Sequence, residues 1–128
     1  MNNNRNVFKS GYMPPDMKIV LKFEELLNHH FREEHNHEFY AAAVGMTVKG
    51  LDKLLRAYLG MTSYELIQER IHQEAINLLL HTTLKIKEIT YELGISNPSW
   101  FCKCFKQKTG LRPRDYRDKV KQEINGIK

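Results

Sequence analysis

The sequence carries one short helical pattern twice, and this internal repeat restricts the possible fold more than any other feature. Residues 40–47 (YAAAVGMT) match residues 89–96 (ITYELGIS) at an offset of 49 positions. Each copy predicts a short helix, a turn that begins with glycine, and a Thr or Ser at the end of the turn. The glycine permits the positive φ that a tight connection between two helices needs. This order of elements is typical of a helix-turn-helix.

The second helix of each copy also repeats, at an offset of 50 because one residue is inserted before the later one. Both helices place apolar residues at i, i+3 and i+4 and end at a glycine, which predicts one buried face for each. The matched positions are Leu51, Leu54, Leu55 and Gly60 in the first copy and Phe101, Cys104, Phe105 and Gly110 in the second. The alternative is a plain helical bundle with an old duplication, which does not explain why caps and core positions match together.

The fold class predicted for the whole chain is all-α, because no segment alternates with a period of two. About seven helices are expected, near residues 17–32, 38–44, 48–59, 63–80, 85–93, 98–109 and from 113 onward. Their starts follow from local signals, which are Thr47 as an N-cap, a capping box at 62–65, and the pair Asn97-Pro98. The predicted domains are a polar tail or linker (1–16), a first helix-turn-helix subdomain (17–61), a linker helix (62–81), a second helix-turn-helix subdomain (82–122) and a frayed tail (123–128).

The positive charge is concentrated in the last third of the chain. The 128 residues include 20 Lys+Arg and 15 Asp+Glu, a formal net charge of +5. Residues 1–81 hold nine Lys/Arg against ten Asp/Glu, whereas residues 82–128 hold eleven against five, a net +6. This excess favours a polyanionic partner, nucleic acid first and a membrane surface second. The sequence has no apolar run near the ~20 residues that span a bilayer and no secretory signal. Its two cysteines are too few for a disulfide framework, so a reducing cytoplasm is expected.

The outward side of each second helix carries a polar stripe. The stripes are Lys49, Asp52, Lys53 and Arg56 in the first copy and Ser99, Cys102, Lys103 and Lys106 in the second. Each follows the i, i+3, i+4, i+7 spacing of one helix face. Such a face fits the DNA major groove, where Lys donates to guanine and Asp accepts from cytosine. Thr47 and Asn97 lie at helix N-termini, which bind phosphate. A solvated charged face is the alternative.

Two stretches of the sequence together carry a specific pattern of residues. The more specific stretch contains Ile86, Ile89, Leu93-Gly94-Ile95-Ser96-Asn97-Pro98-Ser99-Trp100-Phe101, Phe105-Lys106, Gly110, Pro113 and Tyr116-Arg117. The other contains Gly60, Thr62, Arg70-Ile71, Glu74-Ala75 and Leu78-Leu79. Together these residues resemble the DNA-binding domain of the AraC/XylS family of bacterial transcription regulators, and the resemblance covers about residues 18–120. It implies two helix-turn-helix subdomains joined by one rigid helix, with their recognition helices in successive major grooves ~34 Å apart.

The resemblance also implies roles for residues at matching positions. Base contacts are expected from Lys49, Asp52, Lys53, Ser99, Trp100 and Lys103. Phosphate contacts are expected from Thr47, Arg56, Asn97 and Lys106. For Trp100, packing against the protein is an equally weighted alternative. The chain departs from the family at Gly50 (usually aromatic), Ser63 (usually Pro), Thr90 (usually Ala) and Ile95 (usually Phe). Gly50 is expected to cost roughly 1 kcal/mol of helix propensity.

The histidines and cysteines are weaker candidates for chemistry. Four histidines lie among glutamates in residues 29–38. His30 and Glu34 are one helical turn apart, but no rigid pattern places a further metal ligand, so surface histidines are favoured. Cys102 and Cys104 lie on different faces of one helix, which fits neither a zinc site nor a redox pair. We expect Cys104 in the core and Cys102 on the outward side. No metal, no cofactor and no enzymatic activity are expected.

The sequence thus predicts sequence-specific binding of double-stranded DNA and transcription regulation in the cytoplasm. RNA polymerase is a candidate partner and a membrane is not. A separate effector-binding or dimerisation domain is expected outside these residues, which makes the chain a fragment of a longer regulator. The first alternative is a helical protein-interaction module whose basic C-terminal third binds an acidic partner. The second is an enzyme that uses the His and Cys residues.

Overall fold

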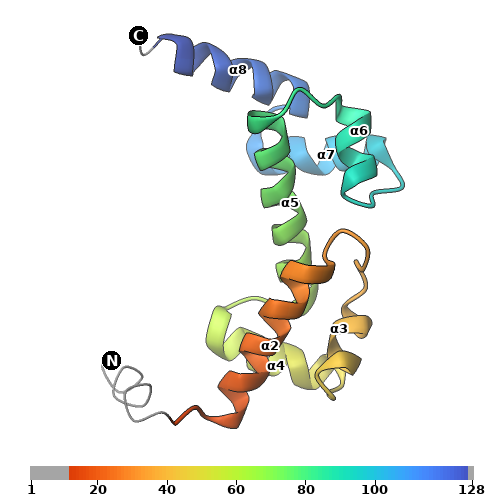
Figure 1. Ribbon diagram of the computed structural model, residues 1–128, viewed down its shortest axis with the longest axis vertical. Helices are drawn as coiled ribbons and strands as arrows, with labels where there is room; N and C mark the ends of the chain where they lie inside the picture. Colours follow the sequence, from red (N-terminus) through yellow and green to blue (C-terminus); the bar gives the residue numbers. More distant parts are fainter. Residues whose placement is uncertain (1–11, 127–128) are drawn as a thin grey trace. The chain divides into compact units, whose positions relative to one another are not determined.

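The computed structural model describes residues 12–126, which form seven α-helices and no strand (Figure 1). The helices are α2 (Pro15–His30), α3 (His37–Ala43), α4 (Val48–Leu59), α5 (Ser63–His81), α6 (Ile86–Glu92), α7 (Pro98–Thr109) and α8 (Pro113–Gly126). The all-α prediction is confirmed. Helix α2 begins two residues inside the predicted polar tail, because Pro15 is tolerated in a first helical turn. Helix α8 extends into the predicted frayed tail, and residues 1–11 and 127–128 lie outside the described residues. No described helix has the length and apolar character that crossing a membrane requires.

The turns and caps follow the local signals in the sequence. Gly45 and Gly94, which start the two turns, have φ of 76° and 70°. Such angles strain any residue with a Cβ, so glycine is needed at both places. The capping box of α5 is complete, because the Thr62 N–H donates to Glu65 Oε1 (2.9 Å) and the Glu65 N–H donates to Thr62 Oγ1 (3.2 Å). These short-range contacts fix where the helices start and stop.

The chain divides into two compact units, and the division falls within α5. Unit 1 contains residues up to His30 together with Glu34–Ile67. Unit 2 contains Phe31–Glu33 together with the residues from Gln68 onward. Each helix-turn-helix pair lies within one unit, α3 with α4 in unit 1 and α6 with α7 in unit 2.

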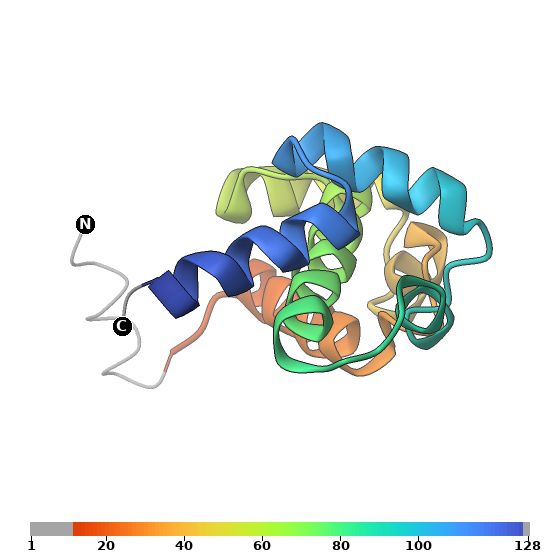
Figure 2. The ribbon, with the colours of Figure 1, turned by 90° about the horizontal axis from the view of Figure 1, so that it is seen from above.

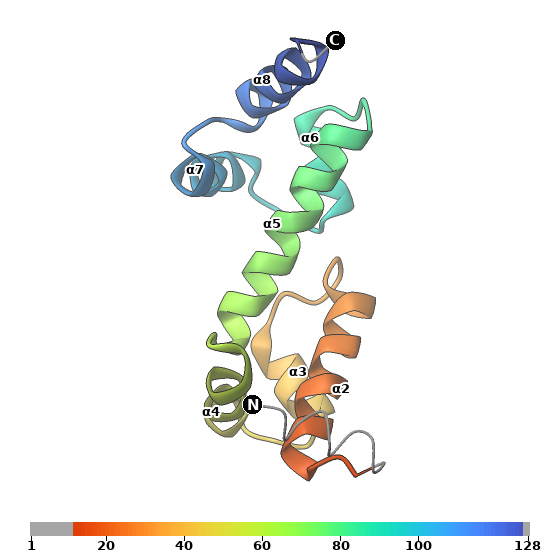
Figure 3. The same ribbon diagram turned by 90° about the vertical axis from the view of Figure 1, so that its left-hand side faces the viewer.

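Unit 1 is built from α2, α3 and α4, which pack against one another (Figure 3). Its core contains Val20, Phe23, Leu27, Tyr40, Ala41, Leu51, Leu55 and Ile67. The Phe23 and Tyr40 rings meet edge to face, with centroids 5.7 Å apart. The buried Tyr40 hydroxyl donates to the Glu34 backbone oxygen at 2.7 Å, so its polar end is satisfied. Helix α4 is thereby held on one side and exposed on the other.

Unit 2 packs α7 against both α6 and α8, whose ribbons are blue-green and dark blue in Figure 2. Its core contains Ile71, Ala75, Leu78, Leu79, Ile89, Leu93, Phe101 and Phe105. The Phe105 ring contacts the rings of Phe101 and Tyr116, at centroid distances of 5.9 and 5.3 Å. Thr90 replaces the usual alanine without an unsatisfied group, because its buried hydroxyl donates to the Lys87 backbone oxygen at 2.8 Å.

Arg117 of α8 caps the C-terminal end of α5 by donating to backbone carbonyl oxygens there. Its Nε donates to the Leu79 backbone oxygen at 2.8 Å, and its Nη2 donates to that of Thr82 at 3.4 Å. The last four carbonyls of a helix have no partner within the helix, and a cation at this end also interacts favourably with the helix dipole. Arg117 therefore has a structural function within the basic part of the chain.

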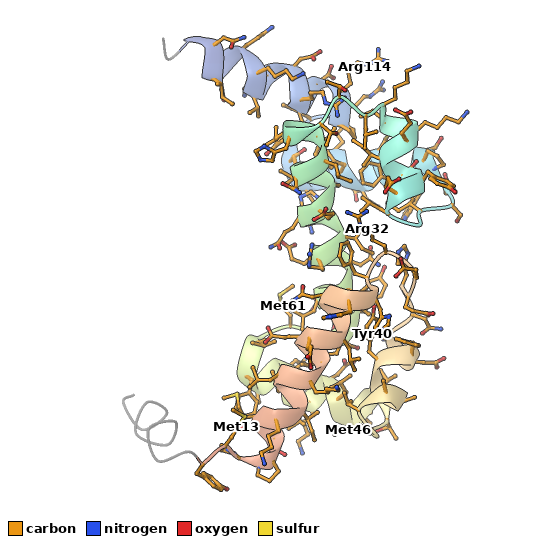
Figure 4. All side chains as sticks on the ribbon, in the orientation of Figure 1. Met13, Arg32, Tyr40, Met46, Met61 and Arg114 are labelled. Carbon is orange, nitrogen blue, oxygen red and sulfur yellow. The ribbon has the colours of Figure 1, made fainter. Side chains whose placement is uncertain are left out.

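We expect Arg117→Met to lower the free energy of unfolding by about 1–2 kcal/mol, because the Leu79 and Thr82 carbonyls lose this donor. Arg114→Met, in the same helix at an exposed position (labelled in Figure 4), should change it by less than about 0.5 kcal/mol. Urea unfolding at pH 7 measures both. Equal losses for the two variants would show that Arg117 is an ordinary surface cation.

Candidate nucleic-acid interface

The exposed side of α4 in unit 1 presents a set of cations that no core contact occupies. Lys49, Lys53 and Arg56 are exposed, and Thr47 at the N-cap is exposed beside them. Their neighbours Leu51 and Leu55 are fully buried on the opposite side of the same helix. We call these four residues together with Asp52 the α4 face. The apolar stripe that anchors the helix thus also orients its cations outward.

Asp52 differs from the rest of the α4 face, because the structure gives its carboxylate a partner within the protein. Asp52 is half-buried, and its Oδ1 accepts a hydrogen bond of 2.8 Å from the backbone N–H of Ser63, the first residue of α5. Proline, which the family usually has at position 63, has no N–H to donate. The departure at Ser63 therefore supplies the donor that holds Asp52, a contact that no local sequence signal indicates.

Gly50, a second position at which the chain departs from the family, lies in the first turn of α4 beside the N-cap Thr47. Its N–H donates to Thr47 Oγ1 at 3.1 Å. A Cβ at Gly50 would lie 3.2 Å from both Thr47 Oγ1 and Met46 Cε, which is tighter than ordinary contact. The aromatic residue usual at this position would require both neighbours to move.

The exposed side of α7 in unit 2 presents the corresponding set of polar residues. Asn97, Ser99, Trp100, Lys103 and Lys106 are all exposed, and we call them the α7 face. Trp100 is 59% exposed, so it is not a core residue. The Lys103 Nζ lies 5.7 Å from the centroid of the Trp100 ring, within the range of a cation–π contact.

Thr47 and Asn97 cap the two helices and keep hydrogen-bonding capacity for a ligand. Thr47 Oγ1 accepts from the Gly50 N–H, and Asn97 Oδ1 accepts from the Trp100 N–H at 3.0 Å. Both caps therefore use acceptor atoms. The hydroxyl hydrogen of Thr47 and the side-chain amide of Asn97 are donors, the kind of group that a phosphate oxygen binds.

Part of the positive charge of unit 2 is neutralised within the protein. Lys108 on α7 forms a 2.8 Å ion pair with Glu69 on α5, and the hydrogen bond from Lys108 lowers the pKa of the Glu69 carboxyl. Burial lowers the pKa of the neighbouring His72, whose ring lies 5.2 Å from that of Phe105, and so favours the neutral form of this side chain. The positive charge that the α7 face presents to solvent therefore comes from Lys103 and Lys106.

In the part of the chain that the structure describes, the remaining histidines and the cysteines give no sign of a metal site or of a reactive centre. Within residues 12–126, no three His, Cys, Asp or Glu side chains lie close enough together to hold a metal ion. The His29 ring lies 3.0 Å from the Glu25 backbone oxygen, and the His37 ring packs on Tyr64. Cys104 is half-buried and not a full core residue, while burial raises the pKa of the half-buried Cys102 thiol.

Comparison with known proteins also identifies a helix-turn-helix domain in this chain. A family model described as a helix-turn-helix domain matches residues 40–119. The chain is 33% identical to the xylose operon regulatory protein of Escherichia coli (strain K12) over 82 residues, which are 64% of this chain and 21% of that protein. It is 27% identical to histidine kinase P4 of Formosa agariphila over 119 residues, which are 87% of this chain and 9% of that protein. The chain thus spans a small part of either relative.

A solved structure shares the fold. The DNA-binding domain of the transcriptional factor AdpA, crystallised in complex with a target DNA, matches with a TM-score of 0.74 and 21% identity. The match covers 87% of this chain and 96% of the other. At this identity the likeness establishes the fold of the chain.

We expect Asp52→Ala to lower the free energy of unfolding by about 1 kcal/mol without any DNA present, because the Ser63 N–H loses its acceptor. Lys53→Ala, at the adjacent exposed position, serves as the matched control and should be nearly neutral. In a Ser63→Pro background, which lacks the donor, Asp52→Ala should cost nothing further. Urea unfolding of the wild type, Asp52→Ala, Ser63→Pro and the double variant gives the coupling free energy between the two positions. A coupling near zero would contradict the hydrogen bond.

Proposed function

The chain belongs to the AraC/XylS family of helix-turn-helix DNA-binding domains, and from this membership we propose that it reads two half-sites of one DNA duplex, with α4 in one major groove and α7 in the next. The observation that carries the proposal is the repeated, exposed polar face on two helices that are each anchored by a buried apolar stripe. A helix of this kind fits the major groove, whose base edges display a distinct pattern for each pair.

Within each face we propose a division between base and phosphate contacts. Lys49, Asp52 and Lys53 on α4 read bases, as do Ser99, Trp100 and Lys103 on α7. Thr47 and Asn97 at the N-caps, and Arg56 and Lys106 in the last helical turns, bind phosphates. The hydrogen bond from the Ser63 N–H engages Oδ1 of Asp52 and leaves Oδ2 with its full capacity to accept from cytosine.

The chain acts in this proposal as a binding module and not as a catalyst. Support comes from the family, which is a helix-turn-helix domain. The match to histidine kinase P4 covers only 9% of that protein. In this proposal the whole regulator, of which this chain is one part, regulates transcription and contacts RNA polymerase. A separate domain of that regulator binds an effector or dimerises. The 21% coverage of the xylose operon regulatory protein supports this division of tasks. This function also implies a location in the bacterial cytoplasm, which is part of the proposal.

Selection from random duplex DNA tests the function directly. We expect it to enrich two short motifs whose centres are about 10 bp apart, one for each helix-turn-helix. The selection uses the full chain at low salt, where non-specific affinity is highest. A pool that stays random would overturn the proposal and favour a protein-interaction module, whose basic C-terminal third would then bind an acidic partner.

Two lysines of the α7 face should separate base readout from phosphate binding. We expect Lys103→Ala to relax preference at one base position by about 1–3 kcal/mol. Lys106→Ala should weaken binding to all sequences equally and reduce the salt slope by about 1, because one phosphate contact is lost. Fluorescence anisotropy against single-base variants of the selected duplex measures both effects. If the two variants behave alike, the assignment of roles within the α7 face is wrong.

A further inference from the structure

A dipeptide from the first quarter of the chain takes part in the packing of unit 2. Phe31 and Arg32 directly follow α2 in sequence, but by their contacts they group with unit 2. Arg32 lies beside α5, as labelled in Figure 4. Its Nη2 donates to Glu74 Oε2 on α5 at 2.8 Å, and its Nη1 donates to Glu92 Oε1 on α6 at 3.1 Å. One guanidinium thus joins two helices of unit 2.

Phe31 is fixed in place by the same group of side chains. Its ring is 5% exposed, and the Arg70 guanidinium lies 4.1 Å from the ring centroid. Arg70 in turn forms a 3.5 Å ion pair with the second oxygen of Glu74. Glu74 is therefore held between two guanidinium groups, and its side chain is only 16% exposed. Ion pairs in such a network contribute more than isolated surface pairs do, because each side chain is already ordered by another contact.

The position of Glu92 shows how the bridge that Arg32 forms between Glu74 and Glu92 stabilises α6. Glu92 is the last residue of α6, a helix of seven residues with no basic residue in its last turn. A carboxylate at the C-terminal end of a helix is unfavourable next to the negative pole of the helix dipole, and a cation there is favourable. Arg32 supplies that cation from outside the helix. Helix α6 packs on α7, the helix that carries the proposed base contacts.

We propose that Phe31 and Arg32 complete the second helix-turn-helix, and that Arg32 is a positioning residue for DNA reading by α7. The bridge ties the end of α6 to α5 immediately before the turn that leads to α7. Without it, α6 loses its C-terminal cation and an attachment to α5, and the orientation of α7 becomes less defined. The proposal rests on the proposed function, because the readout is at the half-site of α7.

The first test requires no DNA. We expect Arg32→Gln to increase hydrogen exchange several-fold in residues 86–97, because α6 and the turn open more often. The equivalent segment of the first copy, residues 37–47, serves as the internal control and should not change. Glu92→Gln removes only one arm of the bridge, and it provides a milder variant if Arg32→Gln does not fold. Exchange at residues 86–97 that equals the wild type in both variants would overturn the proposal.

The second test compares two duplexes. One is the duplex enriched by selection, and the other has the half-site whose readout depends on Lys103 replaced by scrambled sequence. We expect Arg32→Gln to bind the intact duplex roughly fivefold more weakly and the scrambled duplex as well as the wild type does. Arg32→Lys should be intermediate, because an ammonium group cannot donate to both carboxylates in the fork geometry of arginine. Lys22→Gln, which removes an exposed α2 cation paired with Glu25, is the matched control and should bind like the wild type.

The salt dependence of binding tests whether Arg32 contacts DNA directly. A positioning residue leaves the slope of log affinity against log salt unchanged, whereas a residue that binds phosphate reduces it by about 1 when removed. A reduced slope with equal loss on both duplexes would show that Arg32 touches DNA, and would overturn the proposal. If the selection enriches no duplex at all, the proposed function fails, and the exchange experiment alone decides the role of Arg32.

Discussion

Helices of seven residues form too few hydrogen bonds to persist alone in water. Both α3 and α6 have this length, and each is the first helix of a helix-turn-helix. They are stable only because their buried residues, such as Tyr40 in one and Ile89 in the other, pack into the adjoining core. Packing at such close range requires a sharp turn, which the left-handed Gly45 and Gly94 provide. The outward faces of α4 and α7 exist because this packing settles which side of each following helix is buried.

Charge in this molecule divides into an internal part and an outward part. The net +6 of the last third includes Arg117, which closes α5, and Lys108, which pairs with Glu69. Arg32 and Arg70 are likewise used inside unit 2, on Glu74. What remains for a polyanion on the α7 face is a small number of side chains with defined positions, chiefly Lys103 and Lys106. Such an arrangement suits readout at particular bases better than a diffuse basic patch would.

Most of the fold could be predicted from the sequence because its signals are local. A cap acts within three residues, as in the pairs Thr47–Gly50 and Asn97–Trp100, and the apolar spacing of a helix repeats within four. The missed contacts join residues far apart in the chain, such as Arg32 with Glu92. Nothing in the sequence distinguishes an arginine or aspartate that binds within the protein from one that faces outward. Asp52 illustrates this, since its spacing on α4 fits the outward stripe while its carboxylate binds Ser63. The sequence leaves open for the same reason whether Trp100 packs on the protein or contacts DNA. Its exposure shows that it is not in the core.

The placement of Phe31 and Arg32 bears on how such a duplicated domain can change over time. The two copies of the repeat look interchangeable in sequence, yet one of them relies on a dipeptide encoded ahead of the other. A recombination event that exchanged only the later copy with that of a relative would separate Glu92 from Arg32, unless the crossover also carried the earlier codons. The bridge therefore favours inheritance of the two copies together. A chimaera built by joining halves of two relatives within α5 would combine a dipeptide and a pair of acceptors that had never been selected as partners.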